Sequence, residues 1–307
     1  MITVVTPTYN RAHTIVRTFN SLQRQTDKDF LWLVIDDGST DNTRELIDIF
    51  KQQAQFPIEY HYKSNGGRHT ALNESYKYIK TKYVVNLDSD DEYVENAIEL
   101  MKNIWMEIEE REFNQIWCIV GRCIDSKTKK IVGKEFPSGI NNMKFGYKKR
   151  RAIFKANGEK SCCRRFDVLR QYPFPVYEDT NFVREDQVWE KINNKYDQWC
   201  TNEIFRVYYQ NESDSLSVKN RKKMKKNYCS AYHTAVFYIN NCMKQILYNR
   251  LIVFELANVT RIGLLSGRNI LTILSDIENV YAKILVLLCS PIAILYYVYE
   301  KSRYRNE

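Results

Sequence analysis

Residues 84–92 have the sequence VVNLDSDDE, and this stretch decides how the rest of the chain is arranged. Its apolar beginning suits a short buried strand, which ends directly in the carboxylates Asp88, Asp90 and Asp91. A helical pattern follows, so the acids are expected at the C-terminal tip of a strand. Ligands of open α/β sheets bind beyond that edge. The stretch therefore predicts a ligand site at the acids.

Asp88 and Asp90 are two residues apart, so on an extended strand both side chains would point to the same side. Two converging carboxylates repel each other unless a cation lies between them. Mg²⁺ and Mn²⁺ prefer oxygen ligands and commonly share one or two carboxylates with substrate phosphates. We therefore expect Asp88 and Asp90 to hold Mn²⁺ or Mg²⁺. The alternative is a polar turn in which Asp91 caps the next helix, and for Asp91 we prefer that alternative.

Strand and helix patterns alternate through the first part of the chain. Strands are expected at residues 2–6, 30–35, 58–62 and 83–87, with a helical pattern between each and the next. Asn42 with Glu45 resembles a capping box at the start of the second helix. The alternation predicts an α/β fold with a mostly parallel, doubly wound sheet. Right-handed crossovers would place the ends of the first, second and fourth strands along one edge.

Polar residues follow the ends of these strands. Pro7 and Tyr9 follow the first strand, Asp37 follows the second, and Asn65 and Arg68 follow the third. A carboxylate such as Asp37 can accept the N–H of a uracil ring, and a flat side chain such as Tyr9 can cover that ring. Arg68 can neutralise a phosphate. The edge of the sheet is therefore expected to bind a nucleotide.

Two further observations bear on this nucleotide site. The sequence contains neither G-x-G-x-x-G nor G-x-x-x-x-G-K-[ST], so a diphosphate would depend on the cation at Asp88 and Asp90 rather than on a glycine cradle. Asp36 and Asp37 precede Gly-Ser-Thr, which is also ordinary turn chemistry. We prefer the turn for Asp36 and the nucleotide contact for Asp37, because Asp37 lies opposite the strand that ends in carboxylates.

Composition and charge limit the class of partner. The 307 residues carry 46 basic and 37 acidic side chains, a net charge of +9, which favours an anionic partner such as a nucleotide or a phospholipid surface. No RNA-binding or helix-turn-helix signature accompanies this charge, so no nucleic-acid partner is expected. The eight cysteines show no Cys-x-x-Cys pair and no zinc spacing, which favours reduced thiols and the cytosol. No secretory signal is visible.

The composition changes after about residue 211. A dense basic cluster occupies residues 219–226, and the apolar run ILVLLCSPIAILYYVY occupies residues 284–299. This run is slightly shorter than the ~17 residues of the shortest spanning helices and contains Pro291. We interpret it as a membrane-surface or re-entrant helix with aromatic and basic anchors. The alternatives are a buried helix of a C-terminal bundle and a subunit contact.

Four short motifs in order resemble those of family 2 glycosyltransferases with the A-type fold. They are TPTYNR at residues 6–11, IDDGSTD at 35–41, NGG at 65–67 with ALN at 71–73, and LDSDD at 87–91. The match is strong over the first third of the chain and continues weakly to about residue 210. The resemblance implies an inverting transferase with a Rossmann-like sheet. It also implies a nucleotide-activated sugar, most often a uridine diphosphate (UDP) sugar, with Mn²⁺ or Mg²⁺.

The resemblance further implies roles for single residues. It assigns Asp37 to the uracil, Asp88 to the ribose or metal region, and Asp90 to the metal. It places Asp186, or else Glu185, as the base that deprotonates the acceptor hydroxyl. For Asp186 the alternative is an acid at a helix N-terminus, where the helix dipole favours negative charge.

Together these observations predict the organisation of the whole chain. Residues 1–215 are expected to form the catalytic domain, with residues 1–110 binding the nucleotide and residues 111–215 the acceptor. Residues 216–307 are expected to form a helical C-terminal appendage that associates with an anionic membrane surface and that could support homo-oligomers. We expect a bacterial-type enzyme, cytoplasmic and peripheral on the inner face of the cell membrane, that adds a sugar to a lipid-linked saccharide. The rivals are a sugar nucleotidyltransferase and a non-catalytic membrane-associated scaffold.

Overall fold

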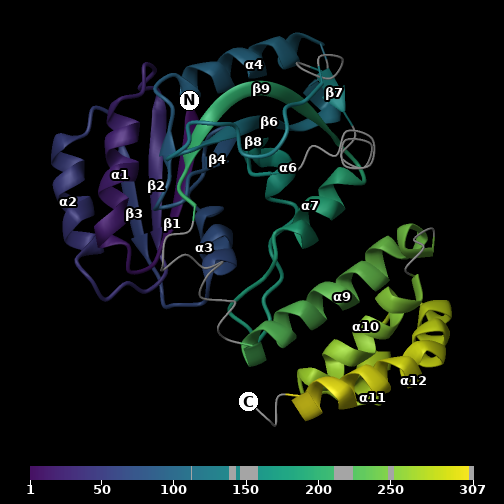
Figure 1. Ribbon diagram of the computed structural model, residues 1–307. Coiled ribbons are helices and arrows are strands. Elements are labelled where there is room, and N and C mark those ends of the chain that lie inside the picture. Colours follow the sequence, from purple (N-terminus) through teal and green to yellow (C-terminus); the bar gives the residue numbers. More distant parts are fainter. Residues whose placement is uncertain (112, 138–142, 146–157, 211–223, 248–251, 304–307) are drawn as a thin grey trace. The chain divides into compact units, whose positions relative to one another are not determined.

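The computed structural model describes residues 1–307 except 112, 138–142, 146–157, 211–223, 248–251 and 304–307 (Figure 1). The chain divides into two compact units. The sheet unit comprises Met1–Phe174 and Val188–Glu212, and the helical unit comprises Pro175–Gln187 and Ser213–Glu307. The segment Pro175–Gln187, which carries the predicted base, therefore belongs with the C-terminal helices.

Four parallel strands form the first half of the sheet, in the order β3-β2-β1-β4. They are β1 (Ile2–Thr8), β2 (Phe30–Asp36), β3 (Ile58–Tyr62) and β4 (Tyr83–Asn86). The helices between them are α1 (Ala12–Gln23), α2 (Thr43–Gln53) and α3 (Arg68–Ser75). The predicted alternation of strands and helices is confirmed, and the C-terminal ends of β1, β2 and β4 follow one another along one edge.

The second half of the sheet is mixed rather than parallel. Its strands are β5 (Glu92–Tyr93), β6 (Ile116–Asp125), β7 (Met143–Phe145), β8 (Lys160–Arg165) and β9 (Asp197–Tyr208). Strand β8 runs antiparallel to both β4 and β6. Strand β9 is parallel to β6 and antiparallel to β5 and β7. The fold is therefore α/β as predicted, with antiparallel strands added beyond β4.

Apolar side chains cover both faces of the central strands. One face buries a cluster that includes Val4, Trp32, Val34 and Val85, together with residues of α1, α2 and α4 (Ala97–Arg111). The other face buries Val5, Leu33, Ile35 and Val84, together with residues of α3, α6 (Phe166–Leu169) and α7 (Asp186–Asn193). Because successive residues of a strand point to opposite faces, a continuous apolar run such as residues 30–35 fits this two-sided burial.

The chain after the acids differs from the prediction. Glu92–Tyr93 form β5, which pairs with β9, and helix α4 begins only at Ala97. The interpretation of Asp91 as a cap of the next helix is therefore wrong. The strand intervenes because its partner β9 comes from a distant part of the sequence, which local patterns do not show.

Asp41 connects the N-termini of α1 and α2. Its carboxylate accepts hydrogen bonds from Ala12 N at 2.9 Å, from Thr43 N at 3.2 Å and from Thr43 Oγ1 at 2.6 Å. Asn42 occupies the N-cap position of α2 but makes no side-chain capping hydrogen bond. The expected capping box of Asn42 with Glu45 is therefore wrong, because the acid one residue earlier satisfies the free N–H groups.

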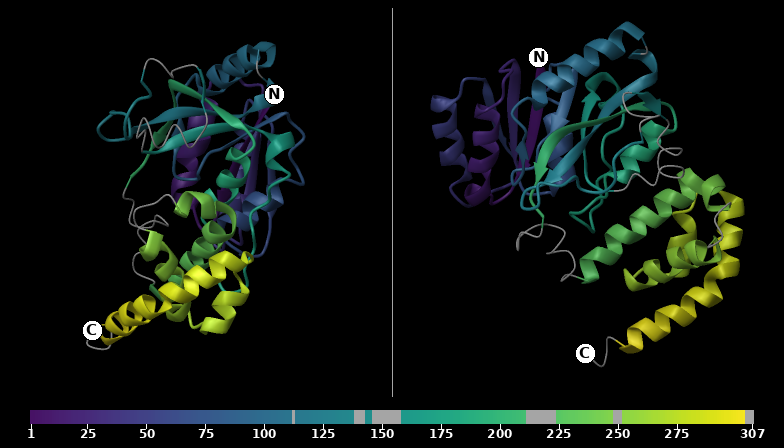
Figure 2. Two further views of the ribbon diagram at one scale, coloured as in Figure 1. Left: turned by 90° about the vertical axis from the view of Figure 1, so that its right-hand side faces the viewer. Right: turned by 45° about the horizontal axis from the view of Figure 1, so that its top comes forward.

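The helical unit contains α9 (Met224–Leu247), α10 (Ile252–Leu265), α11 (Ile270–Ser275) and α12 (Val280–Arg303), drawn in green and yellow in Figure 2. Its core includes Tyr232, Ile239, Leu256, Ile262, Ile273 and Val286. Gly263 lets α10 approach its neighbours closely, because a Cβ there would lie 2.5 Å from Ile273 Cδ1 and 3.1 Å from the Tyr232 ring. The unit thus has a packed apolar core of its own.

Helix α12 carries the predicted apolar run and continues beyond both of its ends. Among the described residues it is the helix that, by length and composition alone, could cross a membrane, over Val280–Ser302 with a mean hydropathy of 1.8. Only 22% of its most apolar window is buried. Its exposed apolar side chains include Tyr281, Ile284, Leu288, Leu295 and Tyr299. Most of this helix therefore lies outside the packed core of the chain.

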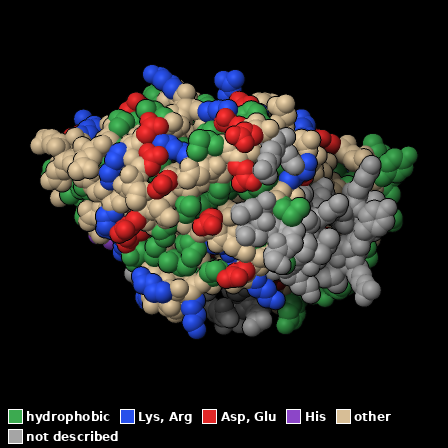
Figure 3. All heavy atoms as spheres, turned by 90° about the horizontal axis from the view of Figure 1, so that it is seen from above, with side chains coloured by type: hydrophobic (Ala, Val, Ile, Leu, Met, Phe, Trp, Pro, Cys, Tyr) green, Lys and Arg blue, Asp and Glu red, His purple; other side chains and the backbone are tan. Residues whose placement is uncertain are grey.

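Charged side chains are interspersed over the face drawn in Figure 3, where acidic and basic groups alternate across the described surface. The net charge of +9 is consequently not gathered into one basic patch on that part of the molecule. The basic cluster predicted at residues 219–226 falls mostly outside the described residues, which resume at Met224.

Candidate active site

Backbone hydrogen bonds fix the segments that follow β1, β2 and β4 beside one another. Asp37 N donates to Thr8 O at 2.8 Å, and Leu87 N donates to Val5 O at 3.0 Å. The carboxyl ends of parallel strands in an α/β sheet form the usual ligand-binding edge. The segments that carry the predicted nucleotide and metal residues therefore start at neighbouring strand ends in the sheet unit.

Asp36 holds the turn after β2. Its carboxylate accepts hydrogen bonds from Ser39 N at 2.7 Å and from Tyr60 Oη at 2.8 Å, and only 1% of the residue is exposed. Gly38 in this turn has φ +89°, and a Cβ there would lie 2.8 Å from Asn65 N. The turn therefore requires glycine at position 38. Asp36 is a turn residue, as expected.

Asp37 fastens the loop before α3. Its Oδ1 accepts hydrogen bonds from Lys63 Nζ at 2.6 Å and from Gly66 N at 3.0 Å, and its Oδ2 accepts from Gly67 N at 2.7 Å. Asn65 Nδ2 donates to Asp37 O at 2.8 Å. Only 3% of Asp37 is exposed. The structure thus brings the predicted nucleotide residues Asp37 and Asn65 together, and it shows Asp37 already engaged by the loop.

Pro7 and Tyr9 have different environments at the end of β1. Pro7 is buried within the strand, whereas Tyr9 just beyond it is 48% exposed. Asn10 has φ 52°, and it joins the two turns because Asn10 N donates to Ser39 Oγ at 2.9 Å while its Oδ1 accepts from Thr40 N at 2.8 Å. The turn after β1 is thereby fastened to the turn after β2, and the Tyr9 ring stays open to solvent.

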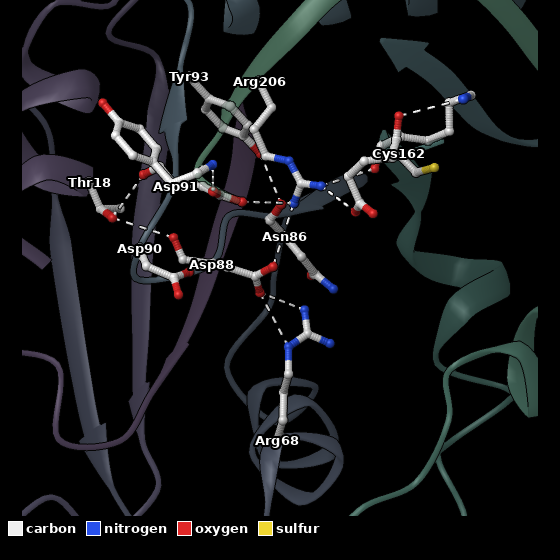
Figure 4. A network of polar contacts seen from close by, with 12 residues as sticks. Thr18, Arg68, Asn86, Asp88, Asp90, Asp91, Tyr93, Cys162 and Arg206 are labelled. Atoms are coloured by element: carbon white, nitrogen blue, oxygen red, sulfur yellow. Dashed lines mark hydrogen bonds and ion pairs between the residues drawn. The ribbon is translucent and has the colours of Figure 1, made fainter. Parts of the chain in front are cut away.

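Asp88 lies between two arginines, as Figure 4 shows. Its Oδ1 accepts hydrogen bonds from Arg68 Nη2 at 2.7 Å and Nε at 3.2 Å, and its Oδ2 lies 3.5 Å from Arg206 Nη1. Burial opposes ionisation, but the charges of Arg68 and Arg206 hold the pKa of Asp88 below its usual value. The predicted nucleotide residues Arg68 and Asp88 therefore contact each other directly.

Arg206 joins Asp91 to the same network (Figure 4). Its side chain lies on β9, only 4% of the residue is exposed, and its guanidinium contacts Asp91 Oδ2 at 3.4 Å and the carboxylate of Glu159. Asp91 is 1% exposed and accepts a hydrogen bond from Tyr209 N at 3.0 Å. Burial raises the pKa of Asp91 to about 8, and the nearby charge of Arg206 limits the rise. Asp91 therefore fastens β9 to the end of β4.

Asp90 is the second of the two predicted metal ligands. Its carboxylate Oδ2 lies 3.9 Å from Arg11 Nη2, and 22% of its side chain is exposed, while its backbone O accepts from Arg17 Nη1 at 2.8 Å. The described residues contain no group of three or more metal-ligating side chains. Mg²⁺ usually takes only one or two protein carboxylates and completes its shell with water and substrate phosphates. Asp90 can supply one such carboxylate, whereas both oxygens of Asp88 already contact Arg68 and Arg206.

Asp186 is the first residue of α7 and belongs to the helical unit. One oxygen, Oδ2, is paired with Arg184 Nη2. The other oxygen, Oδ1, is buried and has no hydrogen-bond partner among the described residues. A buried polar atom without a partner can be satisfied by a ligand, by an ordered water or by a group of the reaction. Glu185 immediately precedes the helix, and Asp186 lies at the helix N-terminus that was its alternative role.

Several residues of this network were not predicted from the sequence, notably Arg206, Lys63 and Arg11. Arg206 had a recognisable signal, since it interrupts the apolar strand sequence IFRVY at residues 204–208. A buried charge in a strand requires a charged partner. Its partners Asp88 and Asp91 are more than a hundred residues away. The sequence therefore indicates that Arg206 has an acidic partner but does not identify which acid it is.

Comparison with known proteins identifies the family of the N-terminal part. The sequence model described as Glycosyl transferase family 2 matches residues 3–175, more than half of the chain. Glycosyltransferase GlyG of Streptococcus pneumoniae is 32% identical over 112 residues, which cover 36% of this chain and 36% of that protein.

A second relative carries a more detailed name. The Escherichia coli protein UDP-Glc:alpha-D-GlcNAc-diphosphoundecaprenol beta-1,3-glucosyltransferase WfgD is 31% identical over 136 residues, which cover 44% of this chain and 50% of that protein. The chain therefore matches half or less of the length of these two curated relatives.

Solved structures agree with the fold of the whole chain. S. aureus TarS 1-349 in complex with UDP-GlcNAc aligns with a TM-score of 0.60 at 17% identity, over 99% of this chain and 91% of that one. At this identity the similarity concerns the fold alone. It confirms the predicted α/β architecture with a helical C-terminal appendage.

Proposed function

The chain belongs to glycosyl transferase family 2 and is a glycosyltransferase, and from that premise we propose that it transfers a sugar from a UDP-sugar to a hydroxyl of a lipid-linked saccharide. One observation carries the proposal: the loops at one edge of the sheet hold Asp37, Arg68, Asp88 and Asp90. A nucleotide fold that ends in acids and arginines at this edge suits a diphosphate donor.

The donor would bind across the turns after β1, β2 and β4. The exposed ring of Tyr9 can cover the uracil, and we assign Pro7 and Asn65 to the same pocket. Asp37 has to accept the uracil N–H in addition to the loop donors that it already binds, which four lone-pair sites on a carboxylate allow. Arg68 is held by Asp88, and its positive charge can attract the diphosphate.

We assign Mn²⁺ or Mg²⁺ to Asp90, with Asp88 as the second carboxylate. When bound there, the cation supplies positive charge that stabilises the departing diphosphate. The residues of the chain orient that site, since Arg17 holds the backbone of Asp90 and Arg68 holds the carboxylate of Asp88. The diphosphate would then provide the remaining oxygen ligands, as is usual for these ions.

Asp186 is the proposed general base, with Glu185 as the alternative. An acceptor hydroxyl oxygen attacks the anomeric carbon on the face opposite the diphosphate, its proton passes to Asp186 Oδ1, and the bond from the anomeric carbon to the diphosphate oxygen breaks. One displacement inverts the anomeric centre, so an α-linked donor gives a β-linked product. General base catalysis of this kind typically contributes ~10²- to 10⁴-fold. The buried Oδ1 without a partner supports this role.

We further propose that the acceptor lies at a membrane and that the enzyme works on its cytoplasmic face. The exposed apolar side of α12 supports membrane association. Lys301 follows the apolar run at its C-terminal end, where a basic side chain can interact with anionic lipid. The name of the E. coli relative, which specifies a diphosphoundecaprenol acceptor, agrees with a lipid-linked substrate.

The proposal is tested by incubating the full chain with a panel of UDP-, GDP- and dTDP-sugars, with Mn²⁺ or with EDTA. We expect UDP to be released from a UDP-sugar only in the presence of the metal. Asp186→Asn should lower this release by ~10²- to 10⁴-fold while UDP binding is unchanged. Release of pyrophosphate from UTP and a sugar 1-phosphate would instead support a nucleotidyltransferase. The absence of any metal-dependent nucleotide binding would support the scaffold.

A further inference from the structure

The segment Pro175–Gln187 is fastened to helix α9 at two places within the helical unit. The first is a tight turn, closed by a bridge between Tyr177 and Thr180, with Asp179 near its tip. The second is Gln187, which directly follows Asp186 in the sequence. The second anchor is thus adjacent in sequence to the proposed general base.

Asp179 is held by a histidine on α9 and by an arginine that follows α10. Asp179 Oδ1 lies 2.7 Å from His233 Nε2 on α9, and Asp179 Oδ2 is paired with Arg268 Nη2, just beyond the end of α10. Arg268 is itself fixed, since its Nη1 donates to Ser266 Oγ at 2.7 Å and its guanidinium lies 4.1 Å from the centre of the Tyr232 ring. The turn therefore docks on a rigid part of the helical core.

A second chain of contacts leads from the same histidine to Gln187. The Tyr177 ring stacks on His233 with 3.6 Å between ring centres and an interplanar angle of 7°. Tyr177 Oη donates to Gln187 Oε1 at 3.2 Å, and Gln187 Nε2 donates to Thr234 Oγ1 at 3.1 Å. Gln187 is 2% exposed and Thr234 is 6% exposed. Losing one partner would leave a buried amide or hydroxyl unsatisfied, which proteins avoid.

We propose that the Gln187–Thr234 hydrogen bond, with Tyr177 and His233, positions Asp186 for proton abstraction, so that α9 contributes a positioning residue to the transferase reaction. The inference rests on the proposed function, because it assumes that Asp186 is the base. A base must lie within hydrogen-bond reach of the proton that it removes, and a displacement of about 1 Å can cost ~10²-fold in rate. Gln187 lies in the first turn of α7 next to Asp186, and Thr234 Oγ1 accepts a hydrogen bond from its amide.

The test compares isosteric variants of two buried threonines in the helical unit. Thr234→Val removes the hydroxyl that accepts from Gln187, whereas Thr260→Val removes a hydroxyl that lies 3.3 Å from Ser290 Oγ and touches nothing in Pro175–Gln187 among the described contacts. UDP release from the UDP-sugar that the wild type uses, with water as the acceptor, is measured over a range of donor concentrations. We expect Thr234→Val to lower kcat about tenfold or more with the KM for the donor unchanged, and Thr260→Val to keep both values.

Two further variants separate positioning from a general loss of structure. Thr234→Ser keeps the hydroxyl and should restore kcat. Adding Thr234→Val to Asp186→Asn should cause no further loss, because the two act through one step. Equal kcat for wild type and Thr234→Val, a matching loss in Thr260→Val, or full additivity with Asp186→Asn would each overturn the inference. If the wild type released UDP from no UDP-sugar, the proposed function itself would fail first.

Discussion

Arg206 is the residue on which the ends of two strands depend. Its buried guanidinium contacts Asp88, Asp91 and the carboxylate of Glu159, so removing it would leave the buried Asp91 without its positive partner. Breaking a buried ion pair by deleting one partner typically costs ~3–5 kcal/mol, far more than the pair contributes over an apolar replacement. The network therefore makes β9 and the turn after β4 mutually dependent.

We expect Arg206→Met to lower the free energy of unfolding by ~3–5 kcal/mol, measured by urea denaturation monitored through tryptophan fluorescence. The matched control is Arg24→Met. Arg24 also pairs with a carboxylate, that of Glu92 at 2.7 Å, but 48% of its side chain is exposed. Exposed pairs contribute ~0–1 kcal/mol, so the control should be nearly neutral. Equal effects of the two variants would show that the burial of Arg206 does not determine its contribution to the free energy of unfolding.

Asp90→Asn tests the metal assignment. Its carboxylate lies 3.9 Å from Arg11 Nη2, and 22% of its side chain is exposed. Because an amide is a weaker ligand for a hard cation, half-maximal UDP release should need at least roughly tenfold more Mn²⁺. Asp48→Asn, on an exposed pair with Lys51, serves as the control. An Asp90→Asn enzyme with the Mn²⁺ dependence of the wild type would exclude Asp90 as a ligand.

Single residues differ in how far the sequence could place them. The positions of Asp37, Asp88 and Asp90 follow from strand ends alone, because the strand pattern fixes the edge of the sheet to which they belong. Arg68 and Asp88 were both predicted, but their mutual ion pair was not. Such pairs depend on side-chain directions in loops, which local patterns do not specify.

At the scale of elements, Asp41 shows how two helices share one acid. We expect Asp41→Ala to destabilise the protein by ~0.5–2 kcal/mol, because it removes hydrogen bonds at the starts of both α1 and α2. Asn42→Ala, one residue later, should be nearly neutral, since Asn42 makes no side-chain cap. Thermal unfolding of the two variants is the measurement. A larger loss for Asn42→Ala would restore the capping box that the sequence suggested.

The same acid gives a dependence on pH. Burial acts to raise the pKa of Asp41, but hydrogen bonds from Thr43 and from the backbone of Ala12 outweigh it and lower this pKa in the folded state. The unfolded carboxyl, with a pKa near ~3.9, therefore binds its proton first as the pH falls. The stability from Asp41 is present above that value and is lost as the pH falls through the lower folded pKa. Urea unfolding between about pH 5 and pH 2 should accordingly show a smaller acid-induced loss for Asp41→Ala than for wild type.

The elements of the second half of the sheet were the hardest to predict. Strand β8 has the sequence KSCCRR at residues 160–165, which shows no clear alternation of apolar and polar side chains. It is a strand because β4 and β6 pair with both of its edges, and its arginines find partners inside the sheet unit, such as the stacking of Arg164 over Trp189 at 4.5 Å. Tertiary pairing thus overrides the weak local pattern.

At the scale of the whole molecule, the proposed membrane contact is tested on the exposed side of α12. Leu288→Glu combined with Leu295→Glu places charges on side chains that are 69% and 72% exposed, so the fold should persist. Burying a leucine contributes ~1.5–3 kcal/mol, and the double variant should therefore sediment with anionic lipid vesicles at least about a hundredfold less well. Met106→Glu on α4, 57% exposed in the sheet unit, is the control. Unchanged sedimentation of the double variant would place membrane contact elsewhere.

The division of the chain has a consequence for how such enzymes can diversify. The backbone passes between the units three times, after Phe174, after Gln187 and after Glu212. A recombination event that exchanged only residues 213–307 would replace His233, Thr234 and Arg268. Their partners Asp179 and Gln187 would remain those of the original chain. Residues 213–307 therefore cannot be exchanged independently of residues 175–187. Substitutions in residues 175–187 should covary among relatives with substitutions on the face of α9 that contacts them.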